Sequence, residues 1–150
     1  DEGDLQIYKD VLLTDLNLDQ PINPVLFMQD DAMKLKERYS GYDAIVAFNL
    51  LEELQNPSVL LHEIHKRIKK DGILVLGSTY EWNEAITRKE NWLGGFKKDG
   101  ESLKSIETIQ DILSGEFTLV ENPFDLKYLT RKSSRNFEVM ISEVSIWRKN

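Results

Sequence analysis

The sequence predicts an α/β fold whose sheet is mostly parallel with an antiparallel edge. The first observation is a strand pattern at residues 43–48, followed by a helical pattern from Asn56 and a further apolar run at residues 73–78. A strand, a helix and a strand joined this closely form a βαβ unit, which places both strands parallel in one sheet. The second observation is that residues 117–120 and 137–147 have strand composition one after the other, which favours an antiparallel edge.

The helix after Asn56 is defined by its ends and by one apolar face. Asn56 can cap it, and Pro57 suits its first turn. The apolar face consists of Leu60, Leu61, Ile64 and Ile68. Basic residues from Lys66 to Lys70 favour its C-terminal end, and Asp71-Gly72 stops it.

A second helix is predicted over residues 103–114, with Ser102 or Ser105 as its cap and Gly115 after its end. The apolar run at residues 24–28 predicts one more buried strand. The first twenty residues favour neither a helix nor a strand.

Composition limits the class of protein. The 150 residues have room for one domain, and they contain no repeat or Pro/Gly-rich linker, so we expect a single domain over residues 1–150. The net charge of −7 argues against a nucleic-acid-binding surface. The absence of cysteine excludes disulfides and thiolate metal sites. With no long apolar segment and no signal peptide pattern, we expect a cytoplasmic protein that does not bind membranes.

Three short segments, each beginning with a polar residue, follow predicted strands at their C-terminal ends, where open α/β sheets bind ligands. These segments are Asp30-Asp31-Ala32, Asn49-Leu50-Leu51 and Ser78-Thr79-Tyr80. A carboxylate at such a position can accept a hydrogen bond from an exocyclic amine. The alternative is that Asp30 and Asp31 only cap the following turn.

The region from Tyr80 to Lys97 combines tryptophans, glycines and charges with little periodicity. Long irregular segments in compact domains are often functional. The aromatic residues either line a pocket or fill the edge of the core, and the sequence leaves both possibilities open. Farther along, Arg131, Lys132 and Arg135 form either a solvated loop or a clamp for a carboxylate.

Several patterns of known chemistry are absent or weak. His62 and His65 lie three residues apart without an evident third ligand, so we interpret them as a solvated helix face and expect no metal site. The sequence contains neither a GxGxxG loop between a strand and a helix nor a Gly-x-Ser-x-Gly elbow.

One tract carries a specific family resemblance. Residues 91–101, Asn-Trp-Leu-Gly-Gly-Phe-Lys-Lys-Asp-Gly-Glu, resemble the W-L-G-G-F-x-x-D-G-E tract of the 4-mercaptohistidine N1-methyltransferases. That domain occurs alone or as the C-terminal part of 5-histidylcysteine sulfoxide synthase, the iron enzyme of ovothiol biosynthesis. Residues 29–32, 62–68 and 142–147 are also similar to this family. Two features depart from its pattern: Asp30 replaces a glycine, and the 129–137 loop lacks an acidic residue after its arginine.

The resemblance implies a Rossmann-like class I methyltransferase fold that uses S-adenosylmethionine. It covers the C-terminal portion of such a domain, because no glycine-rich cofactor loop is found in these residues. We therefore expect the chain to be part of a longer methyltransferase and to be inactive alone. The implied reaction is methylation of an imidazole nitrogen in a thiol-bearing histidine.

The resemblance also implies roles for individual residues. Those expected beside the cofactor are Asp31, Ala32, Asn49 and Leu50. Those expected beside the small-molecule acceptor are Tyr80, Trp92, Phe96, Lys97 and Arg131. No general base is indicated by the sequence.

An alternative hypothesis is a catalytically empty α/β module that acts in assembly or docking. Under either hypothesis, a parallel sheet without its central first strand exposes an apolar edge. We therefore expect the isolated chain to self-associate through that edge or to be unstable.

Overall fold

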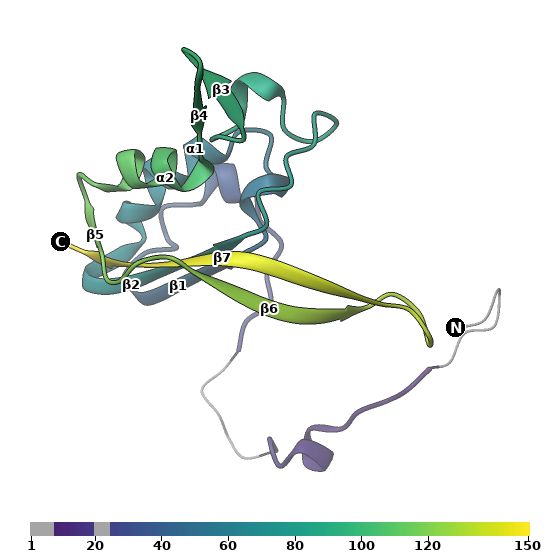
Figure 1. The fold of residues 1–150 in the computed structure, drawn as a ribbon. Coiled ribbons are helices and arrows are strands. Elements are labelled where there is room, and N and C mark those ends of the chain that lie inside the picture. The colour runs from purple at the N-terminus through teal and green to yellow at the C-terminus, as the bar shows by residue number, and fades with distance from the viewer. Residues whose placement is uncertain (1–7, 20–24) are drawn as a thin grey trace. The chain divides into compact units, whose positions relative to one another are not determined.

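The computed structural model describes residues 8–19 and 25–150, which fall into two compact units. The first unit contains residues up to 29 together with residues 129–139, and the second contains residues 30–128 and 140–150. Figure 1 shows the helices and strands. Among the described residues, no helix is long and apolar enough to cross a membrane.

The described part of the first unit has little regular structure. A 3-10 helix, η1 (Leu13–Leu16), ends at Asn17, whose φ is 54°. The prediction of a buried strand at residues 24–28 is wrong for Val25 to Met28, which are exposed and form no strand, while Pro24 lies outside the described residues. An apolar run alone therefore does not identify a strand when no neighbouring strand pairs with it.

The second unit contains the main sheet, whose strand order is β1-β2-β7-β5, with β6 also paired to β7. The bounds are β1 (Tyr42–Phe48), β2 (Ile68–Ser78), β5 (Phe117–Leu119), β6 (Phe124–Arg131) and β7 (Phe137–Lys149). The ends of β6 and β7 from residue 129 to residue 139 belong to the first unit. The strands predicted at residues 43–48, 73–78, 117–120 and 137–147 are thus confirmed.

The sheet is mixed, so the predicted mostly parallel arrangement is wrong. β1 is parallel to β2, whereas β7 is antiparallel to both β2 and β5. β7 lies inside the strand order rather than at an edge, because the chain returns from β5 and β6 to pair beside β2. The parallel unit formed by β1, the helix α1 (Pro57–Glu63) and β2 is as expected.

The first helix is shorter than predicted. α1 (Pro57–Glu63) continues into a 3-10 turn, η4 (Ile64–Lys66), and Ile68 already belongs to β2, where it pairs with Tyr42. Sheet pairing therefore overrides the helical pattern at Ile68 to Lys70. Asn56 is the residue before the helix, but its side chain accepts a hydrogen bond from Ser58 Oγ instead of capping the backbone.

α2 (Ser105–Leu113) begins after Lys104, whose backbone N–H donates to Glu107 Oε2 at 2.9 Å. The predicted caps are not used: Ser102 belongs to β4 (Glu101–Leu103), and Ser105 Oγ accepts a hydrogen bond from Trp82 Nε1 at 3.0 Å. β4 pairs with β3 (Phe96–Lys98) in a separate two-stranded sheet. Asp99 and Gly100 turn between them with φ values of 53° and 88°, as a two-residue Asp-Gly hairpin requires.

The core lies between the sheet and the two α-helices, which Figure 1 shows on the same side of the sheet. Leu74 of β2 is the register partner of Trp147 of β7, and both are almost fully buried. The helices cover them with Leu60 and Leu61 from α1 and with Ile109 and Leu113 from α2. Burial of such large apolar side chains is the main stabilising contribution to the unit.

Gly94, in the tract that carries the family resemblance, packs against the backbone at the start of α2. A Cβ at this position would lie 2.3 Å from Ser105 N and 2.5 Å from the carbonyl carbon of Lys104. Because backbone atoms cannot move aside as a flexible side chain can, only glycine fits. Gly95 follows with a φ of 82° and leads the chain into β3.

We predict that Gly94→Ala lowers the free energy of unfolding by about 1–3 kcal/mol, because the added methyl group pushes α2 away from the tract. Urea unfolding measures the change. Gly115→Ala is the matched control, since a Cβ there meets no atom within 4 Å, and it should change stability by less than about 0.5 kcal/mol. Equal stability of the two variants would contradict this account of the tract.

Candidate functional site

The end of β2 is held by a buried carboxylate. Glu52, in the 3-10 helix η3 (Leu51–Glu53), is only 6% exposed. Its Oε2 accepts a hydrogen bond from Ser78 Oγ at 2.9 Å, and its Oε1 accepts from Thr79 N at 3.0 Å and from Thr79 Oγ1 at 2.9 Å. These bonds join the segment after β1 to the end of β2.

The loop after β2 is fixed to the same place. Thr87, which is fully buried, donates from Oγ1 to the carbonyls of Glu52 and Leu54 at 3.3 and 2.7 Å. Its own carbonyl accepts a hydrogen bond from Trp92 Nε1 at 2.8 Å. Side chains of the loop, bonded to backbone carbonyls of the segment after β1 and of the loop itself, therefore hold this irregular segment in place.

Tyr80, the second residue after β2, adopts a φ of 55°, a left-handed conformation that is uncommon for a bulky residue. Its backbone N–H donates to Ser78 Oγ at 3.0 Å, and its hydroxyl donates to Glu143 Oε1 at 3.0 Å. Burial is the main cause that raises the pKa of the Tyr80 phenol far above its ordinary value, and the nearby charge of Glu143 is the second. The phenol therefore remains a hydrogen-bond donor to Glu143 throughout the physiological pH range.

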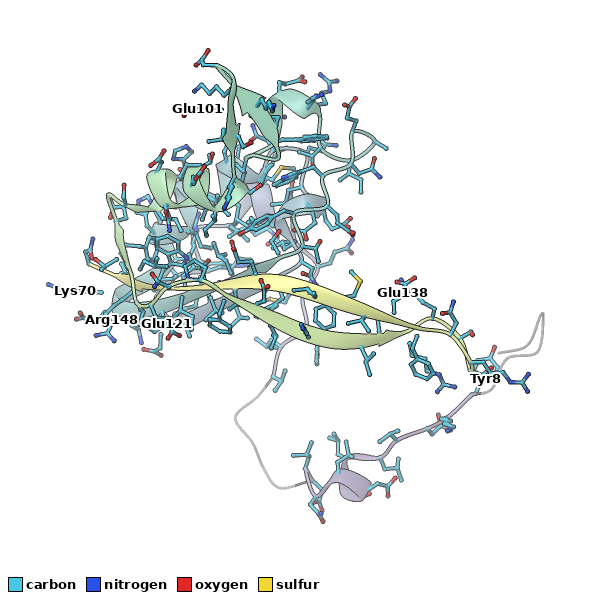
Figure 2. The ribbon with its side chains drawn as sticks, in the orientation of Figure 1. Tyr8, Lys70, Glu101, Glu121, Glu138 and Arg148 are labelled. Carbon is cyan, nitrogen blue, oxygen red and sulfur yellow. The ribbon has the colours of Figure 1, made fainter. Side chains whose placement is uncertain are left out.

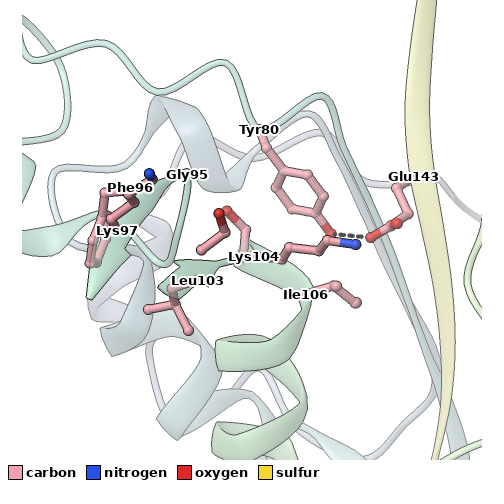
Figure 3. Close-up of a pocket in the computed structure, with 10 residues that line it drawn as sticks. Tyr80, Gly95, Phe96, Lys97, Leu103, Lys104, Ile106 and Glu143 are labelled. Carbon is pink, nitrogen blue, oxygen red and sulfur yellow. Dashed lines mark hydrogen bonds between the residues drawn. The ribbon is translucent and has the colours of Figure 1, made fainter. Parts of the chain in front are cut away.

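Tyr80 and Glu143 border a pocket of about 440 Å³. Its lining residues are Tyr80, Gly95, Phe96, Lys97, Ser102, Leu103, Lys104, Ser105, Ile106 and Glu143. Figure 3 shows Phe96 and Lys97 on one side and the hydrogen-bonded Tyr80–Glu143 pair on the other. The pocket thus combines aromatic rings, two lysines, one carboxylate and hydroxyl groups.

The residues predicted at the acceptor site are only partly brought together. Tyr80, Phe96 and Lys97 line the pocket. Trp92 is outside the lining: its indole Nε1 is bound to Thr87, and the Lys89 ammonium lies 5.7 Å from the centre of its ring. Arg131 belongs to the first unit, where its Nε donates to the carbonyl of Ser133 at 2.9 Å.

The residues predicted at the cofactor site differ in how available they are. Asp31 is exposed and accepts from Met33 N at 2.9 Å, at the start of the 3-10 helix η2 (Ala32–Lys34). The side chain of Asn49 is already engaged, because it donates to Tyr128 Oη at 2.6 Å and accepts from Ser142 Oγ at 2.8 Å. Ala32 and Leu50 are half-buried beside the core.

The pocket lining includes functional groups that the sequence patterns did not indicate, among them those of Glu143, Lys104 and Ser102. Glu143 lies in β7 and is the register partner of Ser78, so it reaches the pocket only through the antiparallel pairing of β7 with β2. Lys104 and Ser102 reach it through the β3–β4 hairpin, which the Asp99-Gly100 pair could have indicated.

In the described part of the chain, no group of three His, Asp or Glu side chains is placed to hold a metal ion. His62 and His65 lie on the successive helices α1 and η4.

Comparison with known proteins identifies a family. Residues 6–115 match the methyltransferase domain family. No curated protein matched the sequence.

Two of the solved structures below, those with TM-scores above 0.5, share the fold at low sequence identity. A structure described as "Conversion of a Disulfide Bond into a Thioacetal Group during Echinomycin Biosynthesis" aligns with a TM-score of 0.59 and 11% identity over 85% of this chain and 57% of its own. A SAM-dependent methyltransferase from Methanosarcina mazei aligns with a TM-score of 0.52 and 18% identity over 80% of this chain and 65% of its own. The N-methyltransferase NodS from Bradyrhizobium japonicum, in complex with S-adenosyl-L-homocysteine, gives a TM-score of 0.47 and 19% identity, covering 80% of this chain and 52% of its own. The chain therefore spans about half to two thirds of the length of these proteins.

We predict that wild-type protein loses stability relative to Tyr80→Phe as the pH rises above about 10. Above that pH the unfolded phenol loses its proton while the folded phenol keeps it, so the unfolded state binds fewer protons. The difference should grow by at most about 1.4 kcal/mol per pH unit. Chemical unfolding at a series of pH values measures it. A Tyr80→Phe variant whose stability changes with pH as wild type does would refute the raised pKa of the Tyr80 phenol.

Proposed function

Because the chain belongs to the methyltransferase domain family, we propose that it supplies the acceptor side of an S-adenosylmethionine-dependent N-methyltransferase. The observation that carries the proposal is the pocket beyond the C-terminal end of β2, the edge at which open α/β sheets bind ligands. The proposed acceptor is a small molecule, a thiol-bearing histidine methylated on an imidazole nitrogen, as in ovothiol biosynthesis.

The groups in the pocket suit an amino acid with a planar ring. Lys97 and Lys104 can each donate to the α-carboxylate of the acceptor, and Glu143 can accept from a ring or amine N–H. Phe96 and Tyr80 offer ring surfaces against which an imidazole can pack.

The residues proposed to hold the cofactor fit it in part. The Asp31 carboxylate has capacity beyond its bond to Met33 N and can accept from the exocyclic amine of adenine, while Ala32 and Leu50 offer apolar contacts. The Asn49 amide already makes one hydrogen bond at each end, which leaves it one N–H and one lone pair for the cofactor. When bound, S-adenosylmethionine supplies an activated methyl group. We propose that its ribose and methionine are held by a glycine-rich loop outside these 150 residues.

The second candidate, a catalytically empty module for assembly or docking, is favoured by one observation. No GxGxxG pattern occurs in the sequence of these 150 residues. Calorimetric titration with S-adenosylmethionine separates the two candidates: binding by the natural protein supports the methyltransferase, and no binding supports the empty module.

We predict that Lys97→Ala raises the KM for 4-mercaptohistidine by about tenfold with little change in kcat, because a charge-assisted hydrogen bond to the acceptor carboxylate is lost. Steady-state methylation kinetics of the natural protein and of its Lys97→Ala variant measure both constants. Lys98→Ala is the matched control, since Lys98 follows directly in β3 and does not line this pocket. An unchanged KM in Lys97→Ala would remove Lys97 from the site.

A further inference from the structure

Glu143 is the single carboxylate among the residues that line the pocket. It projects from β7 opposite Ser78, at the point where β2 ends, and it is half-buried. One of its oxygens accepts the Tyr80 hydroxyl at 3.0 Å, which orients the carboxylate. A carboxylate offers about four lone-pair sites, so Glu143 can still accept hydrogen bonds from a ligand.

The other polar groups on the pocket wall have different roles. Lys97 and Lys104 only donate hydrogen bonds. The Tyr80 hydroxyl is committed to Glu143, and Ser105 Oγ accepts from Trp82 Nε1. Of the charged side chains on the wall, Glu143 alone can accept a proton from a bound ring.

We propose that Glu143 is a catalytic residue that binds the N–H of the acceptor imidazole and takes its proton, while Tyr80 positions the carboxylate. This inference rests on the proposed function. Neutral imidazole has one N–H and one nitrogen with a lone pair. When Glu143 accepts from the N–H, the lone pair is fixed on the other nitrogen, so the carboxylate selects the nitrogen that is methylated.

The reaction is then balanced in atoms and charge. The lone-pair nitrogen forms the new N–C bond to the methyl carbon, and the C–S bond of the sulfonium breaks with its electron pair left on sulfur. The ring becomes positively charged as this bond forms, and the proton on the far nitrogen passes to Glu143. Because the charge develops in the transition state, a fixed carboxylate stabilises that state more than the neutral ground state.

The test is Glu143→Gln in the natural protein, with 4-mercaptohistidine as the acceptor. The amide keeps the size of the side chain but loses its charge, and its NH2 group can donate to the ring nitrogen that should react. The expected kcat is about 100-fold lower, and NMR of the product should show methylation spread over both ring nitrogens. Glu121→Gln, an exposed carboxylate outside the pocket (Figure 2), is the control and should resemble wild type.

A binding measurement without cofactor gives an independent readout. The ¹⁵N shifts of ring-labelled histidine should show a single imidazole tautomer when the histidine is bound to wild type. When it is bound to Glu143→Gln, the shifts should show the other tautomer or a mixture of both. If Glu143→Gln fails to fold, the test uses Glu143→Asp and Tyr80→Phe instead. The aspartate variant should retain the wild-type methyl isomer, and the phenylalanine variant should lower kcat while leaving KM unchanged.

The outcomes separate this inference from the function on which it rests. Wild type that methylates neither 4-mercaptohistidine nor histidine refutes the proposed function, and the role of Glu143 falls with it. Wild type that is active, together with Glu143→Gln that keeps the same rate, isomer and bound tautomer, overturns the role of Glu143 alone.

Discussion

The buried carboxylate of Glu52 accepts hydrogen bonds from Ser78 and from both the backbone and the side chain of Thr79, and these bonds determine where β2 ends. Without the carboxylate, the buried Ser78 hydroxyl would lack this acceptor, at a cost of about 1–3 kcal/mol, and the half-buried Thr79 donors would lose theirs. Ser78 Oγ in turn accepts from Tyr80 N, so the left-handed turn at Tyr80 begins at this cluster. Glu52 thus supports the turn that directs the Tyr80 ring along the pocket wall, while Glu143 holds the hydroxyl at the far end of that ring.

The opposite wall is set by close backbone packing. Gly94 lies against the first residues of α2, and Trp82 Nε1 donates to Ser105 Oγ in the same region, so the segment after β2 and the start of α2 are held together. Phe96 and Lys97 follow directly in β3 and line the pocket from that side (Figure 3). Gly94 thus serves the site through packing and Gly95 through its positive φ, while the residues after them present the functional groups.

Local patterns predicted most of the elements but not how they are assembled. β1 and β2 could be predicted from their apolar runs, and α1 from the helical spacing of its apolar face. The run at Val25 to Met28 has the same composition and forms no strand, because a strand also requires a paired neighbour. Tyr80, Phe96 and Lys97 could be proposed from a family resemblance. Glu143 could not, because in sequence it is one polar position in an alternating strand, and only the pairing of β7 with β2 brings it to Tyr80.

Amide hydrogen exchange of Glu52→Ala, compared with wild type and with the exposed neighbour Glu53→Ala, tests the role of Glu52 most directly. We predict that the Thr79 and Tyr80 amides exchange about 10–100-fold faster in Glu52→Ala, while the amides of Leu74 and Val75 in the β2 ladder keep their protection. In Glu53→Ala all of these amides should exchange as in wild type. Unchanged exchange at Thr79 and Tyr80, or an equal acceleration along the whole of β2, would show that the Glu52 carboxylate does not set the end of the strand.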